Sequence, residues 1–263
     1  MTADRIARAE RLGDWFELQL RFAAHMAGRL ALPLADCVLR FTNLHRRFGL
    51  GDPDAARSPL WDGFAAGLRP DDLPAQRSWT QDFFAAAAPE PPSPQQRYFG
   101  SFSCEAPDAA GVVRIHFVNR DLDGSSPLGR DKIGRRRGEL AALFDHLAVN
   151  HGQAKYVKGI SWLYHLPAYR RLFPTPYGAS ARPVAWARLS GTSSWGQFLR
   201  HDETVRPAAR DIFLANLATL DPAAPWRSFP LPVLTVQAPI GLFHAFYAAP
   251  AGSHNVDELT AQL

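Results

Sequence analysis

The chain has 263 residues, of which 46% are hydrophobic and 21% are charged, and its formal net charge is +4. This composition is typical of a globular protein and excludes a globally disordered chain, a collagen-like fibre and a disulfide scaffold, since Cys37 and Cys104 are its only cysteines. The positive charge is carried mostly by scattered arginines rather than by a dense basic face, so we expect no nucleic-acid partner.

The location of the protein is predicted from what the sequence lacks. It has no run of about 18 apolar residues, so we expect neither a membrane span nor a membrane partner. Charged residues interrupt the N-terminal segment, so we expect no signal peptide. The two cysteines form no C-x-x-C motif, which fits a reducing compartment. We therefore predict a soluble, cytoplasmic protein.

Residues 1–88 are predicted to be helical. Apolar residues recur every three or four positions from Asp4 to Leu30, which predicts an amphipathic helix. A second helix is predicted between Pro33, which suits a first helical position, and Gly49, which suits the residue after the last turn. The segment Ser78-Trp79-Thr80-Gln81 matches a capping box and predicts the start of a third helix.

A proline-rich segment separates this region from the rest of the chain. Four prolines in residues 89–94 exclude a helix there. We therefore expect a helical N-terminal region over 1–88, a linker over 89–97 and an α+β domain over 98–263. The segments Tyr98–Cys104 and Val112–Val118 are predicted to form a hairpin. In the second strand Val112, Arg114, His116 and Val118 share one face.

The next segments predict a βαβ unit. Leu140, Leu143, Phe144 and Leu147 form an apolar stripe on a helix from Ile133 to Asn150, and a strand follows at Lys155–Leu163. This crossover is long enough to join parallel strands. Further along we expect a short helix over 166–172, a loop over 173–183 and a strand over 184–189. Next we expect a helix over 207–220, with Ile212, Phe213, Leu217 and Leu220 facing inward. A strand over 231–236 and a helix over 240–247 should complete the domain. The fold class is α+β: a helical N-terminal region, then a mixed β-sheet with covering helices.

The ends of the two parallel strands are the predicted ligand site, because open α/β sheets bind ligands beyond the carboxyl ends of their strands. The first strand leads into Asn119 and Arg120, and later Ser125 and Ser126; the second leads into Ser161, Trp162, Tyr164 and His165. These side chains donate hydrogen bonds or move protons. Residues of the same types also cap turns, and the aromatic ones also pack cores, which are the alternative interpretations.

A basic run, residues 130–137, lies at the N-terminus of the helix that begins at Ile133. It carries five positive charges and one negative charge. Cations are unfavourable at a helix N-terminus, whereas anions bind well there. The run therefore predicts that Arg130, Lys132, Arg135 and Arg136 hold an anionic ligand. The alternative is a solvated charged face that Asp131 and Glu139 partly neutralise.

Residues 112–173 resemble the core of GNAT-type acyltransferases. The resemblance rests on Arg135-Arg136-Arg137-Gly138 opening a helix, the strand after it, and Ala168-Tyr169-Arg170-Arg171-Leu172-Phe173. In that family a Q/R-x-x-G-x-G/A motif binds the CoA pyrophosphate through backbone N–H groups, and a later tyrosine often acts as general acid. The resemblance implies CoA as cofactor, Arg135 and Gly138 facing it, and Tyr169 as proton donor; Leu140 stands where the motif ends in Gly or Ala.

Two further patterns in the sequence bear on catalysis and metal binding. Gly159-Ile160-Ser161-Trp162-Leu163 is similar to the G-x-S-x-G elbow of serine hydrolases, with Ser161 as nucleophile and His165 as base, although Leu163 replaces the second glycine. The alternative is an ordinary strand serine. The nine histidines form neither H-x-x-x-H nor H-E-x-x-H, so we predict no metal site, although ligands from distant segments are left open.

Together these patterns predict a small-molecule enzyme, transferase-like, that handles an anionic or phosphorylated ligand. The candidate catalytic residues are His116, Tyr164, His165, Tyr169 and Ser161. The candidate ligand-binding residues are Asn119, Arg120, Ser125, Ser126, Arg130, Lys132, Arg135, Arg136 and Trp162. The alternative is a non-catalytic binding or assembly protein that uses the helical block and Ile240–Tyr247 as an apolar interface. Neither the substrate nor the oligomeric state follows from the sequence.

Overall fold

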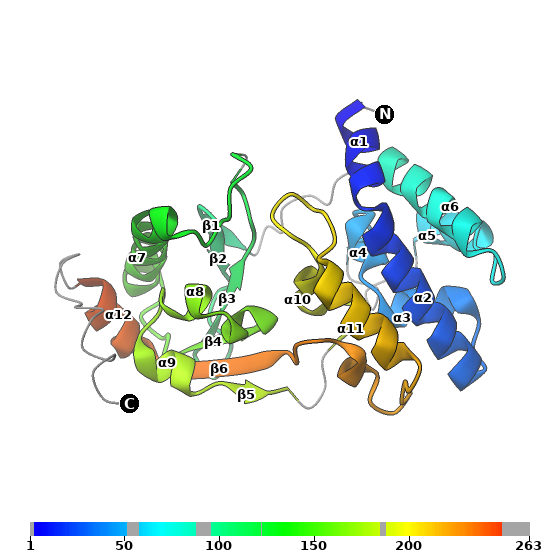
Figure 1. Cartoon of the computed structure of the whole chain (residues 1–263). Helices are drawn as coiled ribbons and strands as arrows, with labels where there is room; N and C mark the ends of the chain where they lie inside the picture. Colours follow the sequence, from blue (N-terminus) through cyan, green and yellow to red (C-terminus); the bar gives the residue numbers. More distant parts are fainter. Residues whose placement is uncertain (1–2, 52–57, 88–95, 122, 185–187, 249–263) are drawn as a thin grey trace. The chain divides into compact units, whose positions relative to one another are not determined.

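The computed structural model describes residues 3–51, 58–87, 96–121, 123–184 and 188–248 (Figure 1). The chain forms two compact units. The first, which we call the helical unit, comprises Met1–Pro92 and Pro183–Leu234; the second, the sheet unit, comprises Ser93–Arg182 and Thr235–Leu263. The predicted α+β domain over 98–263 includes residues 183–234, which the structure groups with the N-terminal helices. Most of the predicted linker, and the middle of the predicted strand 184–189, lie outside the described residues.

The helical unit begins with six helices. They are α1 (Ala3–Arg11), α2 (Gly13–Leu30), α3 (Leu34–Phe41), α4 (Leu44–Arg47), α5 (Pro59–Ala66) and α6 (Leu73–Ala86). The first two predicted helices are each divided in two, at Leu12 and at Thr42–Asn43. The predicted start of the third helix is wrong: Asp72 caps α6 by accepting a hydrogen bond from Ala75 N at 2.9 Å, so the Ser78–Gln81 segment lies inside the helix.

The later elements of this unit are α10 (Thr192–Trp195), η3 (Gly196–Phe198), α11 (Pro207–Leu217) and η4 (Pro225–Ser228). Aromatic packing joins them to the N-terminal helices. The ring centroid of Phe22 on α2 lies 5.7 Å from that of Trp195, 5.6 Å from that of Phe213 and 5.7 Å from that of Phe229. On α11, Phe213 and Leu217 are buried as predicted, whereas Ile212 is 49% exposed, contrary to the prediction.

The sheet unit begins with β1 (Arg97–Phe99), β2 (Phe102–Cys104), β3 (Val112–Phe117), η1 (Arg130–Lys132), α7 (Ile133–Asn150) and β4 (Tyr156–Ser161). After these come η2 (Trp162–His165), α8 (Pro167–Arg170), α9 (Thr175–Ala179), β5 (Arg182–Pro183), β6 (Leu234–Pro239) and α12 (Ile240–Ala248). The helix α9 lies where a loop was expected. The strand order is β1-β2-β3-β4-β6-β5.

The sheet is mixed, which confirms the predicted α+β class and its βαβ unit. β1, β2 and β3 are antiparallel neighbours, and β3 pairs with β4 in parallel, with Val112 opposite Tyr156 and Arg114 opposite Lys158. The N–H of Ile240, just after β6, donates to the carbonyl oxygen of Lys155, just before β4, at 2.9 Å. The end of β6 therefore lies beside the start of β4.

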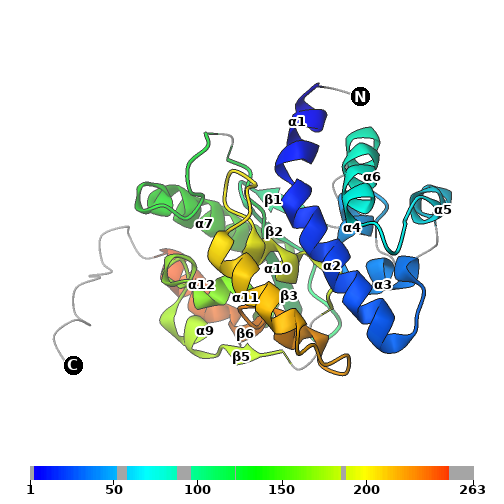
Figure 2. The same ribbon diagram turned by 45° about the vertical axis from the view of Figure 1, so that its right-hand side comes forward.

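The two faces of the central strands differ. Val113 and Ile115 of β3 and Val157 of β4 are buried, whereas Arg114 of β3 and Tyr156 of β4 are exposed. The stripe of Leu140, Leu143, Phe144 and Leu147 on α7 is buried as predicted. α12 packs beside α7 in both views of the chain, with the Phe144 and Phe243 rings stacked at 4.7 Å (Figures 1 and 2). One face is therefore apolar core, and the other carries polar side chains.

No single helix in the described part of the chain is long and apolar enough to cross a membrane. The pair α2 and α3 reaches the required length and composition together, but it is bent by 119°.

Candidate functional site

Three of the five cations of the basic run at the start of α7, Lys132, Arg135 and Arg136, are paired with carboxylates within the chain. Lys132 Nζ lies 2.8 Å from Asp121 Oδ2 and 2.9 Å from Asp123 Oδ1. The Arg136 guanidinium donates to both oxygens of Glu139, at 2.7 and 2.8 Å, and also to Asp121. The side chains of Arg136 and Asp121 are each 1% exposed. These predicted anion-binding cations are therefore held by carboxylates of the loop and of α7 itself.

Arg135 belongs to the same network. Its guanidinium lies 3.2 Å from Asp121 and 3.1 Å from Glu139, so Lys132, Arg135 and Arg136 face three carboxylates in all. Glu139 also accepts a hydrogen bond from the backbone N–H of Ser101 at 3.1 Å, in the turn between β1 and β2. The network therefore fastens this turn and the loop after β3 to α7, which is a structural role.

The electrostatics of Asp121 agree with this role. Burial raises the pKa of its carboxyl group, but hydrogen bonds from Lys132 and Arg136 outweigh burial, and the net pKa lies below the ordinary value. The carboxylate is thus charged at neutral pH. Arg130, by contrast, is exposed and has no partner among the described residues, so its charge is available to a ligand.

The candidate residues after β3 form turns. Asn119 Oδ1 accepts from Asp121 N at 3.1 Å, and Asp123 Oδ1 accepts from the N–H and hydroxyl of Ser125. The carbonyl of Ser126 accepts from Gly129 N at 3.1 Å. The Arg120 guanidinium lies 4.3 Å from the centre of the Tyr98 ring. These local contacts fit the alternative interpretation given above, in which these loop residues cap turns and support the fold instead of binding a ligand.

The candidate residues after β4 lie largely in the core. Ser161 Oγ accepts from Leu163 N at 3.1 Å and so caps η2, while Trp162 is 7% exposed. Tyr164 and Tyr169 come together, with ring centroids 5.2 Å apart, and both are buried. Burial raises the pKa of each hydroxyl well above its ordinary value. His165, the candidate base, is half-buried, and its side chain is not free of contacts with the rest of the chain.

A buried tyrosine pair explains the glycine in β4. The hydroxyls of Tyr164 and Tyr177 lie 3.0 Å apart. A Cβ atom at Gly159 would strike the Tyr164 hydroxyl and would lie 2.6 Å from that of Tyr177. Gly159 is therefore needed for close packing rather than for a nucleophile elbow, and the space beneath β4 is filled by aromatic side chains.

The exposed face of the sheet brings other chemistry-bearing residues together. His116 Nε2 lies 2.7 Å from Glu105 Oε1, and both side chains are 38% exposed. His116 was a sequence candidate, but Glu105 was not, because the contact depends on the register of β2 and β3, which puts Ser103 opposite His116. Such a carboxylate fixes the orientation of an imidazole that moves protons.

Two cations accompany this pair on the same face. Arg114 lies two residues before His116 on β3, and its register partner on β4 is Lys158. Neither Arg114 nor Lys158 has a hydrogen-bond or ion-pair partner within the described ranges. The sequence analysis named neither, although the alternation of β3 already placed Arg114 beside His116.

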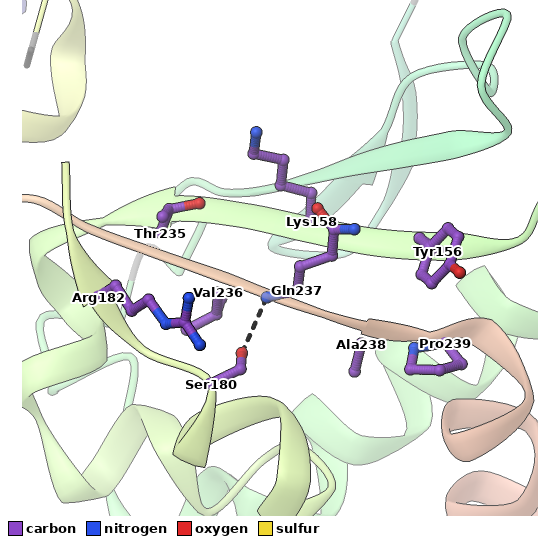
Figure 3. Close-up of a pocket in the computed structure, with 9 residues that line it drawn as sticks. All are labelled: Tyr156, Lys158, Ser180, Arg182, Thr235, Val236, Gln237, Ala238 and Pro239. Atoms are coloured by element: carbon purple, nitrogen blue, oxygen red, sulfur yellow. Dashed lines mark hydrogen bonds between the residues drawn. The ribbon is translucent and has the colours of Figure 1, made fainter. Parts of the chain in front are cut away.

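A groove of about 350 Å³ continues from Lys158 across β6 to β5. It is lined by Tyr156, Lys158, Ser180, Arg182, Thr235, Val236, Gln237, Ala238 and Pro239 (Figure 3). The hydroxyl of Ser180 accepts from Gln237 N at 2.9 Å and so joins the segment before β5 to β6. Two lining residues are cations and none is an acid. The groove therefore favours anions.

In the described part of the chain, no group of three or more His, Cys, Asp or Glu side chains is placed to hold a metal ion. No protein family, curated protein or solved structure matches the chain. The similarity to GNAT-type acyltransferases therefore rests on the sequence segments that carry it, and the function has to be inferred from the geometry.

Proposed function

We propose that the protein binds a small anionic or phosphorylated molecule on the exposed face of the sheet and acts on it as a transferase-like enzyme. Arg114 and Lys158 hold the anion, and His116, oriented by Glu105, moves the proton. The observation that carries this proposal is the pair of cations in register on β3 and β4, which have no ion-pair partner in the described part of the chain, beside a histidine–carboxylate pair.

The cation pair is unfavourable without a ligand. Neighbouring strands lie about 4.8 Å apart, and side chains in register project from the same face. Like charges in such positions destabilise a sheet. An anion between Arg114 and Lys158 replaces this repulsion by two charge-assisted hydrogen bonds, each of about 1.5–3 kcal/mol. The strands therefore present a site that is more favourable occupied than empty.

The histidine–carboxylate pair favours an enzyme over a passive binder. When the Nε2 proton of His116 is donated to Glu105, Nδ1 carries the free lone pair and can accept a proton. In a group transfer, this base removes the proton of the acceptor nucleophile and returns it to the leaving group. We propose this role for His116, which was a catalytic candidate from the sequence. CoA-type ligands remain within the anionic class that we propose.

The test is a comparison of single cations. Inorganic pyrophosphate is titrated against the full chain by calorimetry, with Lys158→Met, Arg114→Gln and the control Arg130→Gln, which removes one exposed charge at the start of α7. Each of the first two variants should weaken binding tenfold or more, and the control less than threefold. If Arg130→Gln weakens binding and Lys158→Met does not, the anion site lies at α7. If the unaltered chain binds no pyrophosphate, the proposal is wrong.

The interface alternative has less support. In the segment Ile240–Tyr247, Phe243 is buried and stacked on Phe144, so this apolar piece packs within its own unit. The most exposed large apolar side chains, Leu60 at 62% and Val149 at 82%, lie in different units. A cytoplasmic location is part of the proposal, and the two unpaired cysteines, both buried, fit a reducing compartment.

A further inference from the structure

The groove beside Lys158 has two chemically different ends. Figure 3 shows Tyr156 and Pro239 at one end and Arg182 at the other, with Lys158 and Gln237 between them. The first end offers an aromatic ring and a proline. The other parts offer two cations, an amide and hydroxyl groups. A ligand that fills the groove should therefore combine an apolar planar part with an anionic part.

The side chains at the two ends are available. Tyr156 is 41% exposed, and within the described residues its ring stacks on no other ring and its hydroxyl makes no hydrogen bond. Arg182 is exposed and likewise has no ion-pair partner in the described part of the chain. An exposed tyrosine ring is a platform on which a planar base can stack. An exposed arginine fork is suited to phosphate oxygens.

The position of Tyr156 relative to Lys158 suits a nucleotide. Two residues along a strand advance about 6.6 Å and point to the same face. A phosphate held at Lys158 therefore lies within one sugar's length of a ring stacked on Tyr156. The volume of about 350 Å³ lies at the lower end of small-molecule sites and is enough for a mononucleotide.

We propose that the ligand of this site is a nucleotide-type molecule, whose planar base stacks on Tyr156 and whose phosphate binds Lys158, with Arg182 adding positive charge to the groove. This inference rests on the proposed function, because Lys158 belongs to both sites. It adds the chemical class of the ligand and a specificity residue, Tyr156, which the sequence analysis did not single out.

The experiment compares three probes on the full chain by calorimetry: AMP, ribose 5-phosphate and inorganic phosphate. AMP should bind about tenfold more tightly than the other two. Tyr156→Ala should abolish this advantage and leave the affinity for inorganic phosphate unchanged, whereas Tyr156→Phe should keep it. The unchanged phosphate affinity of Tyr156→Ala also serves as the control for its folding.

The outcomes separate the two proposals. If all three probes bind equally well and Tyr156→Ala changes nothing, the nucleotide inference is overturned and the anion site stands. If AMP binds more tightly but Tyr156→Ala keeps the advantage, the base lies elsewhere and the inference is again overturned. If no probe binds, the proposed function fails as well.

Discussion

Replacing Arg136 with methionine tests whether the basic run is structural. The guanidinium is 1% exposed and donates to the Pro127 carbonyl at 2.9 Å, to both Glu139 oxygens and to Asp121. Removing one partner of a buried ion pair costs about 3–5 kcal/mol. Asp121 and Glu139 each keep another cation, and methionine fills much of the vacated volume. We therefore expect a loss near the lower limit, about 3 kcal/mol.

The assay is urea unfolding of the full chain, with hydrogen exchange of the α7 amides and of the β1–β2 turn as the local measurement. Arg130→Met is the matched control, and because Arg130 is exposed it should change stability by less than about 0.5 kcal/mol. The reasoning is refuted if the Arg136 variant is as stable as the control. A stable Arg136→Met protein that has lost pyrophosphate affinity would restore this residue to the ligand site.

Three other predictions follow from buried groups. Asp121 has a lowered pKa in the folded chain, so its stabilising contribution is complete above the unfolded pKa of about 4 and is lost as the pH falls below it. The urea midpoints at pH 6 and pH 3 should therefore lie closer together in Asp121→Asn than in the unaltered chain, and an unchanged difference would contradict this. Gly159→Ala should cost about 1–3 kcal/mol through its clash with the Tyr164 hydroxyl, and Tyr164→Phe in the same chain should recover part of this cost in a double-mutant cycle; additive effects would contradict the clash. Burial raises the pKa of the Cys104 thiol to about 11, so at pH 8 roughly one thiol in a thousand is ionised, and Ellman's reagent should modify Cys104 and Cys37 only on unfolding; rapid reaction of the native chain would show that the thiols are accessible.

The spacing of apolar residues along the sequence predicted the helices and strands that bury a single apolar face. The helix Ile133–Asn150 is observed with the predicted bounds, because its apolar stripe and its length follow from short-range pattern. The two parallel strands are also observed, but the second ends at Ser161, and the predicted strand residues Trp162 and Leu163 lie in η2. The start of α6 was misplaced since two capping signals compete. The cap at Asp72, followed by a proline in the first turn, begins the helix, and the later Ser78 segment continues it.

Contacts between residues far apart in the sequence could not be predicted from local patterns. The packing of Phe22 against Phe213 and Phe229 brings residues 183–234 into the helical unit, and no local signal marks it. Glu105 reaches His116 across two antiparallel strands, a contact that depends on register. The contact between Arg135 and Glu139, by contrast, was readable, since residues four apart on a helix are neighbours.

Charge is informative about ligands only after the pairs within the chain have been removed. The densest basic segment loses most of its excess charge once Asp121, Asp123 and Glu139 are placed against it. Arg114 and Lys158 stand singly in the sequence, yet the fold puts them in register on neighbouring strands, and neither has an ion-pair partner among the described residues. Since a sheet loses stability by aligning like charges, we propose that this arrangement serves a bound anion rather than the support of the fold. On this proposal the chemistry takes place on the exposed strands, and α7 supports them.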